Sequence, residues 1–387
     1  MEAGNSPEKR KGKNKVIGGE IMANETEKTL YIGVDYHKKS FTVAYIDNLK
    51  EVLTLQKYRS EEMEKFKGHL KSFKEKGYKL KVAVETLTGV MHFTEEIMGL
   101  VDELRYVNTN KFKNVLKGVN NAKTDKIDAE TIGIYYMMGL LPTVYVPSRE
   151  EKELRLKLKE RESYIEIRKG LMNRVHSVLL EYGIKIKNRE LLTEKGKKRI
   201  KLEIEEKLPS YMKGMLLREI EVIEYMTEKI KESEKEIEVY IGEREELKEK
   251  VDKLKSIPGV GKIVAVSMVS VIGDEKRFSN GDKVASYIGL VPRVSSSGER
   301  EKNGRITKKG DSSLRNKLVQ AANALIKSKT KNSLKEFYQR LIRKGISKQK
   351  AIIAVARKLA KVMYVVLKEG REFIDFVTNK RNLALTG

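Results

Sequence analysis

The order of strand-like and helix-like segments in residues 29–147 constrains the fold more than any other feature of this sequence. In 29-TLYIGVDY-36, Leu30, Ile32 and Val34 alternate with the residues between them, which is the period of a β-strand. After this first strand, the pattern predicts strands at 41–47, 51–58, 79–85 and 104–109, a helix at 60–76, and a helix after each of the last two strands. The first three strands are expected to form an antiparallel meander.

Three strands, a helix, a strand, a helix, a strand and a helix is the element order of the RNase H-like (RuvC-like) α/β fold, so residues 29–147 are interpreted as one such domain. Residues 148–255 are predicted to be almost wholly helical, and residues 256–372 to form a third, mostly helical unit. Residues 1–28 lack periodicity and are predicted to be a disordered tail, with Met22 as an alternative start, and residues 373–387 are a second tail. Amphipathic, basic helices are expected near 314–328, 333–343 and 347–368.

The end of the helical region carries a heptad pattern. Eight of the ten residues at its a and d positions are apolar, which predicts a coiled coil. An antiparallel helical hairpin within one chain would show the same stripe, and the sequence does not separate the two. Gly242 interrupts the pattern. The ten positions are Ile223, Met226, Ile230, Ser233, Ile237, Tyr240, Arg244, Leu247, Val251 and Leu254.

Charge and composition limit the partners and the chemistry of the chain. Lys and Arg number 80 against 55 Asp and Glu, and this net charge of +25 points to a polyanionic partner such as nucleic acid. A solvated Lys/Glu-rich surface would explain the high charged fraction but not the surplus of positive charge. The absence of cysteine excludes disulfides and thiolate chemistry, and the four histidines lack the spacing of zinc ligands. No signal peptide and no apolar run of about 20 residues is visible, so a cytoplasmic protein is expected.

Four carboxylates stand out in the first domain. Asp35 and Glu85 each lie at the end of a predicted strand, while Asp125 and Asp128 are three residues apart and share one face if that segment is helical. An RNase H-like sheet would bring all four to one edge, where they would suit Mg²⁺, and two such ions can stabilise the attacking and leaving oxygens of a phosphodiester. Each carboxylate alone is more often a turn former, a helix cap or a surface charge, but together in a basic chain they favour a metal site.

Two later stretches contain features that suit contact with phosphates. In 256-SIPGVG-261, a tight Pro-Gly turn between helices is similar to a helix-hairpin-helix that grips a DNA backbone, and a plain helix junction has comparable weight. Residues 293–317 read as a flexible loop with eight basic and three acidic residues. Ser297 in this loop is a candidate nucleophile, although composition alone would make it a linker residue. No histidine is nearby, so its proton would pass to a carboxylate, a metal-bound hydroxide or water.

Six short runs along the chain form a specific combination. They are YIGVD (31–35), VAVE (82–85), KTDKIDA (123–129), SIPGVG (256–261), YIGLVP (287–292) and SSG followed by GRITKKG (296–310). Together they resemble one family, the DEDD transposases of insertion-sequence family one-ten, which includes Piv-type invertases. The resemblance covers about residues 29–370. Two positions depart from the family pattern: His37 replaces a small residue, and Thr88-Gly89 follow Glu85 one residue later than usual.

The resemblance implies roles for particular residues and partners. By position, Asp35, Glu85, Asp125 and Asp128 would bind two Mg²⁺ ions, and Ser297 would be the nucleophile. The family works as oligomers, dimers or tetramers, that combine the acidic domain of one subunit with the serine domain of another, and it is guided by a structured bridge RNA. The expected contacts to donor DNA, target DNA and this RNA are Arg155, Arg161, Arg168, Arg174, Gly259, Gly261, Lys262, Arg293, Arg300, Arg305, Lys308, Lys309 and Arg315.

The sequence therefore predicts a Mg²⁺-dependent DNA transposase or recombinase that exchanges strands through a phosphoserine intermediate. One alternative is a junction-resolving nuclease that uses metal-activated water, in which Ser297→Ala would retain cleavage. The other is a non-catalytic nucleic-acid-binding protein, in which Asp125→Asn would change nothing.

Overall fold

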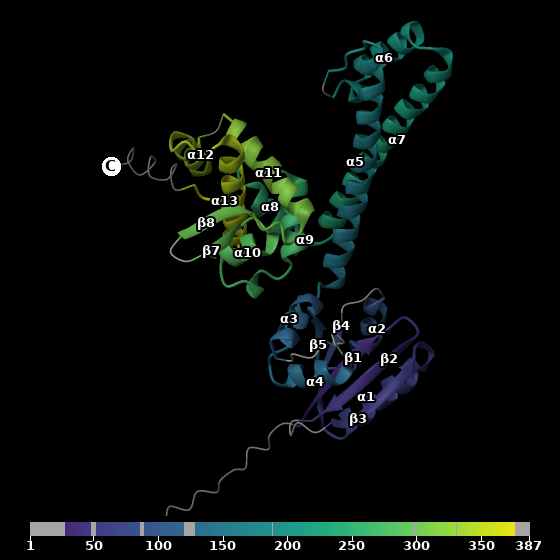
Figure 1. Ribbon diagram of the computed structural model, residues 1–387, viewed down its shortest axis with the longest axis vertical. Helices are drawn as coiled ribbons and strands as arrows, with labels where there is room; N and C mark the ends of the chain where they lie inside the picture. Colours follow the sequence, from purple (N-terminus) through teal and green to yellow (C-terminus); the bar gives the residue numbers. More distant parts are fainter. Residues whose placement is uncertain are drawn as a thin grey trace, which may run out of the picture. The chain divides into compact units, whose positions relative to one another are not determined.

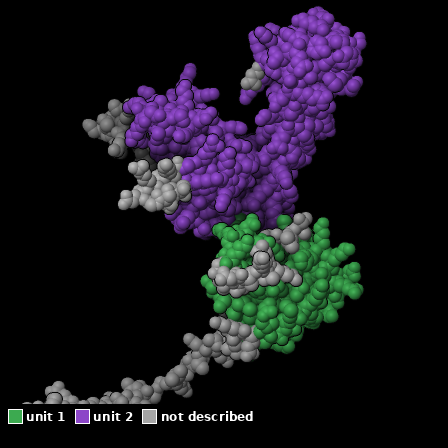
Figure 2. Space-filling view, viewed as in Figure 1, with its two compact units in different colours: residues 1–146 green, residues 147–387 purple. Residues whose placement is uncertain are grey.

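The structure is a computed structural model, and it describes residues 28–47, 52–85, 89–119, 128–187, 189–297, 300–329 and 331–375. Most of both predicted tails, and Asp125, lie outside these residues. The chain divides into two compact units, residues 1–146 and 147–387, coloured separately in Figure 2. The two units are described in turn.

The first unit is built on a six-stranded mixed sheet with the order β3-β2-β1-β4-β5-β6. β1 pairs antiparallel with β2 and parallel with β4, and β4 pairs parallel with β5. The predicted mixed α/β unit and its order of five strands are confirmed, and a short sixth strand is added at the edge. The strands are β1 (Thr29–Tyr36), β2 (Ser40–Ile46), β3 (Val52–Arg59), β4 (Lys79–Glu85), β5 (Glu103–Val107) and β6 (Thr143–Val144).

Helices cover both faces of this sheet because its central strands are apolar on both sides. On one face, alternate residues of β1 and β4 such as Val34 and Val84 pack with Phe66 and Phe93 from two helices. On the other face, Ala83 packs in a smaller cluster with side chains from the remaining two helices. The helices are α1 (Met63–Glu75), α2 (Val90–Ile97), α3 (Thr109–Val119) and α4 (Ala129–Met137).

The second unit is mostly helical and contains one two-stranded sheet (Figure 1). The helices and strands of the second unit are α5 (Arg149–Glu181), α6 (Glu194–Lys207), α7 (Ser210–Gly242), α8 (Glu245–Lys255), α9 (Lys262–Ile272), α10 (Gly281–Ile288), β7 (Pro292–Ser297), β8 (Arg300–Ile306), α11 (Ser312–Lys327), α12 (Ser333–Arg343) and α13 (Lys348–Glu369). No helix in the described part of the chain is long and apolar enough to cross a membrane.

The apolar residues of the predicted heptad pattern pack within one chain. α5 and α7 form an antiparallel hairpin with α6 near its tip (Figure 1), and ion pairs such as Lys157–Glu236 and Arg174–Glu219 join the two long helices. Ile223, Ile230 and Ile237 of the stripe are buried in this hairpin and in the core next to it. The structure therefore favours the hairpin over a coiled coil on this stripe, and the helix breaks between Gly242 and Glu245, where the sequence pattern was flawed.

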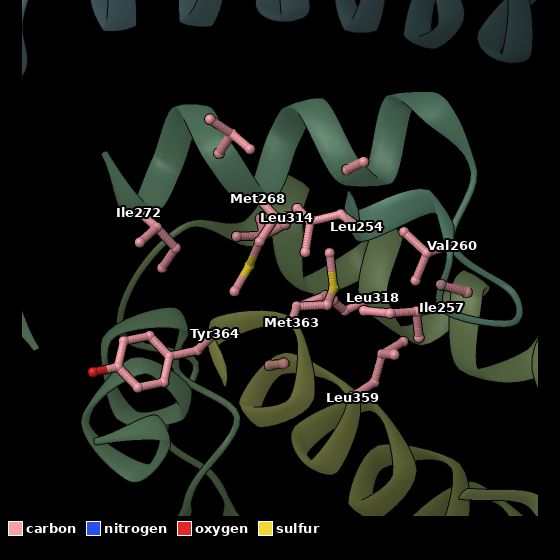
Figure 3. Close-up of a cluster of buried hydrophobic side chains, with 14 of the residues drawn as sticks. Leu254, Ile257, Val260, Met268, Ile272, Leu314, Leu318, Leu359, Met363 and Tyr364 are labelled. Carbon is pink, nitrogen blue, oxygen red and sulfur yellow. The ribbon is translucent and has the colours of Figure 1, made fainter. Parts of the chain in front are cut away.

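The predicted boundary at residue 255 is not a break in packing. Side chains of α5, α7 and α8 share one hydrophobic core with α9, α11 and α13. Figure 3 shows part of this core, where side chains from helices far apart in the sequence meet. The side chains it labels are Leu254, Ile257, Val260, Met268, Ile272, Leu314, Leu318, Leu359, Met363 and Tyr364.

Candidate active site

Two of the four predicted carboxylates lie side by side at the end of the central strands. Val34 of β1 pairs with Val84 of β4 in parallel register, so the next residues along, Asp35 and Glu85, are neighbours. Side chains at matching positions of adjacent strands point to the same face. The two carboxylates therefore lie together at the carboxyl end of the sheet, as the sequence predicts.

The face that carries this pair is the face covered by α4. A Cβ added to Gly33 would overlap the carbonyl oxygen of Ala129 and the amide nitrogen of Gly133, so α4 lies directly against β1. Alternation along β1 places Asp35, two residues later, on the same side of the strand as Gly33. Small residues in the strand and in the helix thus let α4 pack directly on β1, on the face that carries the carboxylate pair.

Asp128 immediately precedes α4 and is its N-cap. Its backbone is extended (φ −116°, ψ 169°), and its carboxylate accepts a hydrogen bond of 2.8 Å from the Thr131 amide. Asp128 therefore lies just outside the helix, because an N-cap aspartate satisfies a free amide of the first turn. The predicted face shared by Asp125 and Asp128 stays a prediction. Asp125 itself, and the alternative pairing of these aspartates with Lys123 or Lys126, lie outside the described residues.

The carboxylate pair is electrostatically strained. Burial raises the pKa of the Glu85 carboxyl, and the negative charge of Asp35 raises it further. The charges of Lys113 and His37 and a hydrogen bond with Thr109 act in the opposite direction. The His37 ring Nε2 lies 3.3 Å from a carboxylate oxygen of Asp35, which is itself nearly buried. Glu85 is therefore harder to ionise beside Asp35, and a nearby cation would stabilise its charged form.

This donor set fits a divalent metal ion. Carboxylate oxygens on two adjacent strands are the ligands that a hard cation takes. Within the ranges that the structure describes, no three Asp, Glu or His side chains are grouped closely enough to hold a metal.

Thr109 and Lys113 are two neighbours of Glu85 that sequence reasoning missed. Both belong to α3, which follows β5, the strand paired with β4 on the side away from β1. The predicted strand 104–109 contained Thr109, whereas β5 ends at Val107 and Thr109 begins α3. In the sequence, His37 is only a departure from the family pattern, and nothing there indicates its contact with Asp35.

Ser297 is the last residue of strand β7 and does not lie in a loop. β7 and β8 form an antiparallel hairpin in which Ser297 pairs with Arg300, so the predicted flexible loop at 293–317 is corrected to a hairpin followed by the start of α11. The charges and glycines of this stretch favour a loop locally, but its two segments pair as strands. Residues 298–299, which follow Ser297 between the two strands, are outside the described part.

The base of the hairpin is fixed by tight backbone packing. Gly289 and Gly310 both have positive φ, and a Cβ on either would overlap backbone across the junction. The Arg315 guanidinium donates to the Ile288 carbonyl at 2.9 Å, so this predicted nucleic-acid contact braces the junction. Four other predicted cations near the hairpin are exposed, and only the backbone of Arg300 is described. The exposed ones are Arg293, Arg305, Lys308 and Lys309.

The Pro-Gly turn before α9 is also packed internally. Gly259 has φ +83°, and an added Cβ would lie 2.7 Å from the Ala321 carbonyl oxygen, so α11 explains this glycine. Gly261 borders open space and is the N-cap of α9, and Lys262 pairs with Glu238. A phosphate contact at Gly261 and Lys262 stays a prediction.

The four predicted arginines of α5 make contacts within the second unit. Arg161 forms an ion pair with Glu234, Arg174 with Glu219, and Arg168 donates to the Thr227 hydroxyl at 3.2 Å. The three hold the α5–α7 hairpin together. Arg155 reaches α9, where its Nε donates to the Ser270 carbonyl at 2.7 Å and its Nη2 to the Val271 carbonyl at 3.3 Å. Arg155 thus caps the C-terminal end of α9, where a positive charge is favourable.

Replacing Arg155 by alanine is expected to lower the free energy of unfolding by about 2–3 kcal/mol, because two half-buried carbonyls lose a charged donor. Urea denaturation measures this change. Arg149→Ala is the matched control on the same helix: Arg149 is 90% exposed and pairs with Glu153, so its loss should cost less than about 1 kcal/mol. Unchanged stability of Arg155→Ala together with weakened nucleic-acid binding would contradict the capping role.

Two family models match the chain. One, described as a DEDD transposase of the IS110 type, matches residues 32–184, which contain the carboxylate pair. The other, the transposase IS116/IS110/IS902 family, matches residues 251–339, which contain the β7–β8 hairpin. Together they cover more than half of the sequence.

Curated relatives agree with these matches. The transposase for insertion sequence element IS1111A of Coxiella burnetii is 27% identical over 343 residues, covering 87% of this chain and 89% of the relative. The transposase for insertion sequence element IS1328 of Yersinia enterocolitica is 27% identical over 76% of this chain and 85% of the relative. The pilin gene-inverting protein of Moraxella lacunata is 34% identical over 129 residues, 33% of this chain and 40% of the relative. The chain belongs to the IS110 family of DEDD transposases, enzymes that cleave and rejoin DNA.

Proposed function

We propose that this protein is an insertion-sequence transposase that cuts and exchanges DNA strands through a phosphoserine intermediate, with Mg²⁺ bound at the carboxylates of its first unit. The observation that carries the proposal is the pair of Asp35 and Glu85, side by side at the end of β1 and β4 in the region that matches the DEDD transposase model. Two adjacent buried or half-buried carboxylates raise the free energy of the protein unless a cation or a proton joins them.

Asp35, Glu85 and Asp128, with Asp125, are the residues that would hold two Mg²⁺ ions. When bound, such ions stabilise charge on the attacking and leaving oxygens of a phosphodiester. The carboxylates of β1 and β4 fix two ligands on a rigid sheet, while α4, seated on Gly33, positions the third. His37, at 3.3 Å from Asp35, orients that carboxylate.

Ser297 supplies the nucleophile in this proposal. Its Oγ attacks the phosphorus of a DNA strand, an Oγ–P bond forms and the P–O3′ bond breaks. The proton of Oγ passes to water, and the departing 3′ oxygen takes up a proton. Reversal with a different 3′-hydroxyl forms the new phosphodiester and restores the serine, so no external energy is needed because the ester is conserved.

The surroundings of Ser297 suit this step. Ser297 is the last residue of β7, and the exposed cations Arg293, Arg305, Lys308 and Lys309 lie on or next to the β7–β8 hairpin. Cations at this place would bind the phosphates on either side of the attacked one.

A guide RNA and an oligomer complete the proposal. The surplus of 25 positive charges suits phosphate backbones, which carry no sequence information, so choice of site would come from base pairing with a structured bridge RNA. Dimers or tetramers would combine the carboxylates of one subunit with the serine of another.

The proposal is tested by reconstitution. The protein is mixed with labelled donor and target DNA, RNA transcribed from the noncoding flank of its element, and Mg²⁺. Joined donor–target product is expected only in the full mixture, and it should disappear when EDTA is added or the RNA is omitted. Product that forms equally well without the RNA would overturn the guide-RNA part, and product in EDTA would overturn the metal part.

A further inference from the structure

We propose that the corner between α12 and α13, residues 340–350, is a docking surface for the phosphate backbone of duplex DNA. This surface is called the α12–α13 corner below. It lies beyond residue 339, where the second family match ends. The proposal deepens the proposed function and rests on it only for the choice of DNA as the polyanion.

The corner concentrates positive charge without compensation. Its sequence, 340-RLIRKGISKQK-350, has five basic residues and no acidic one, and all five are exposed. Among the described residues, no carboxylate forms an ion pair with any of them. The α5–α7 hairpin differs, because Lys157 and Arg161 of α5 each form an ion pair with a glutamate of α7. Lys201 of the neighbouring α6 likewise pairs with Glu224 of α7. The five cations are Arg340, Arg343, Lys344, Lys348 and Lys350.

A hydrogen-bonded backbone presents these cations in a fixed arrangement. α12 ends at Arg343 and α13 begins at Lys348, so the two helices are joined by four residues. Gly345 has φ +77°, which lets its amide bond to the Ile342 carbonyl at 2.9 Å, and the Ile346 amide bonds to Leu341 at 3.1 Å. Buried Ala351 anchors the start of α13 in the core. Like charges held this close repel one another, and a row of phosphates removes that repulsion.

The chemistry of the corner favours a backbone over unpaired bases. Proteins that hold single strands stack the bases on aromatic side chains, and residues 340–350 contain no aromatic residue. Two helices joined by a short turn that contains glycine can meet a duplex with the turn and the first residues of the second helix. Ser347, Lys348, Gln349 and Lys350, at the start of α13, are all exposed.

Salt dependence distinguishes phosphate contacts from a general effect of charge. The variant Arg343→Gln/Lys344→Gln/Lys348→Gln removes three charges from the corner. The control Lys71→Gln/Lys231→Gln/Lys235→Gln removes three exposed charges from α1 and α7, which also form no ion pair in the described structure. Binding of a fluorescent DNA duplex and of the flanking RNA is measured by anisotropy from about 50 to 200 mM salt, in EDTA so that no strand is cut.

The corner variant is expected to bind duplex DNA at least about tenfold more weakly at about 100 mM salt, and the slope of log K against log salt should become shallower by about two to three. The control should stay within about twofold of the wild type, and both variants should unfold at the wild-type temperature.

Equal losses in the corner and control variants would overturn the proposal, and so would loss of RNA binding with DNA binding intact, which would make the corner an RNA surface. Because the assay needs neither metal nor Ser297, failure of the proposed chemistry leaves its result unaffected.

Discussion

Replacing Asp35 by asparagine is expected to reduce DNA strand cleavage by on the order of 10³-fold or more. Asp35 is a candidate metal ligand on a rigid strand, and metal-bound oxygens are stabilised by several kcal/mol, which at about 1.4 kcal/mol per tenfold gives this loss. Asparagine keeps the shape of the side chain but removes the charge. The measurement is the single-turnover rate of cleavage on a labelled donor duplex, with Glu75→Gln, an exposed carboxylate of α1, as the control.

The same variant has a second readout that separates catalysis from folding. Asp35→Asn removes one of two neighbouring negative charges, so the first unit should be as stable as the wild type or more stable without metal. Mg²⁺ should raise the melting temperature of the wild type and have a much smaller effect on the variant, since binding to the folded state stabilises it. A lower melting temperature in EDTA would show that Asp35 has a structural role, and unchanged cleavage would remove it from the active site.

Replacing Gly33 by alanine is expected to destabilise the first unit by about 3 kcal/mol or more and to abolish cleavage. The added methyl group would overlap backbone atoms of α4, which cannot yield as the end of a flexible side chain does. α4 would have to move away from β1, and Asp128 with it. The control is Gly68→Ala in α1, where an added Cβ meets nothing within 4 Å, and here alanine should stabilise the helix by about 0.5–1 kcal/mol.

Both changes are measured by thermal and urea denaturation of the full chain. A Gly33→Ala variant of wild-type stability would show that α4 is not seated on β1. A stable variant with normal cleavage would also contradict the role of this contact in placing Asp128.

The first unit was largely predictable from the sequence because its signals are local. Period-two alternation located β1 to β5 to within a few residues, and the strand order then placed Asp35 and Glu85 at one edge. The contact between Gly33 and α4 was not predictable, since a glycine in a strand does not indicate which helix packs against it. The sequence did not identify Asp128 as an N-cap, because an N-cap and a first-turn aspartate look alike in a short apolar segment.

The second unit was less predictable because its apolar stripes do not identify their partners. The heptad residues of α7 pack on α5 of the same chain. The arginines of α5, predicted to contact nucleic acid, bind residues of α7 and α9. The β7–β8 hairpin was not predicted because serines, glycines and charged residues favour loops locally. The two segments nevertheless pair, since only two residues separate them in the sequence. The sequence predicted the cations of residues 340–350 only as members of basic helices and did not predict that they would gather at one exposed corner.

The central claim, a covalent link between Ser297 and DNA, has a direct test. The protein, with Mg²⁺, flanking RNA and 5′- or 3′-labelled donor DNA, is denatured and run on a gel that separates free DNA from DNA attached to protein. The account predicts an adduct for the wild type and for Ser295→Ala, two residues earlier on the same strand, and none for Ser297→Ala. Cleaved DNA without any adduct, unchanged in Ser297→Ala, would contradict the serine mechanism and favour a nuclease that uses water.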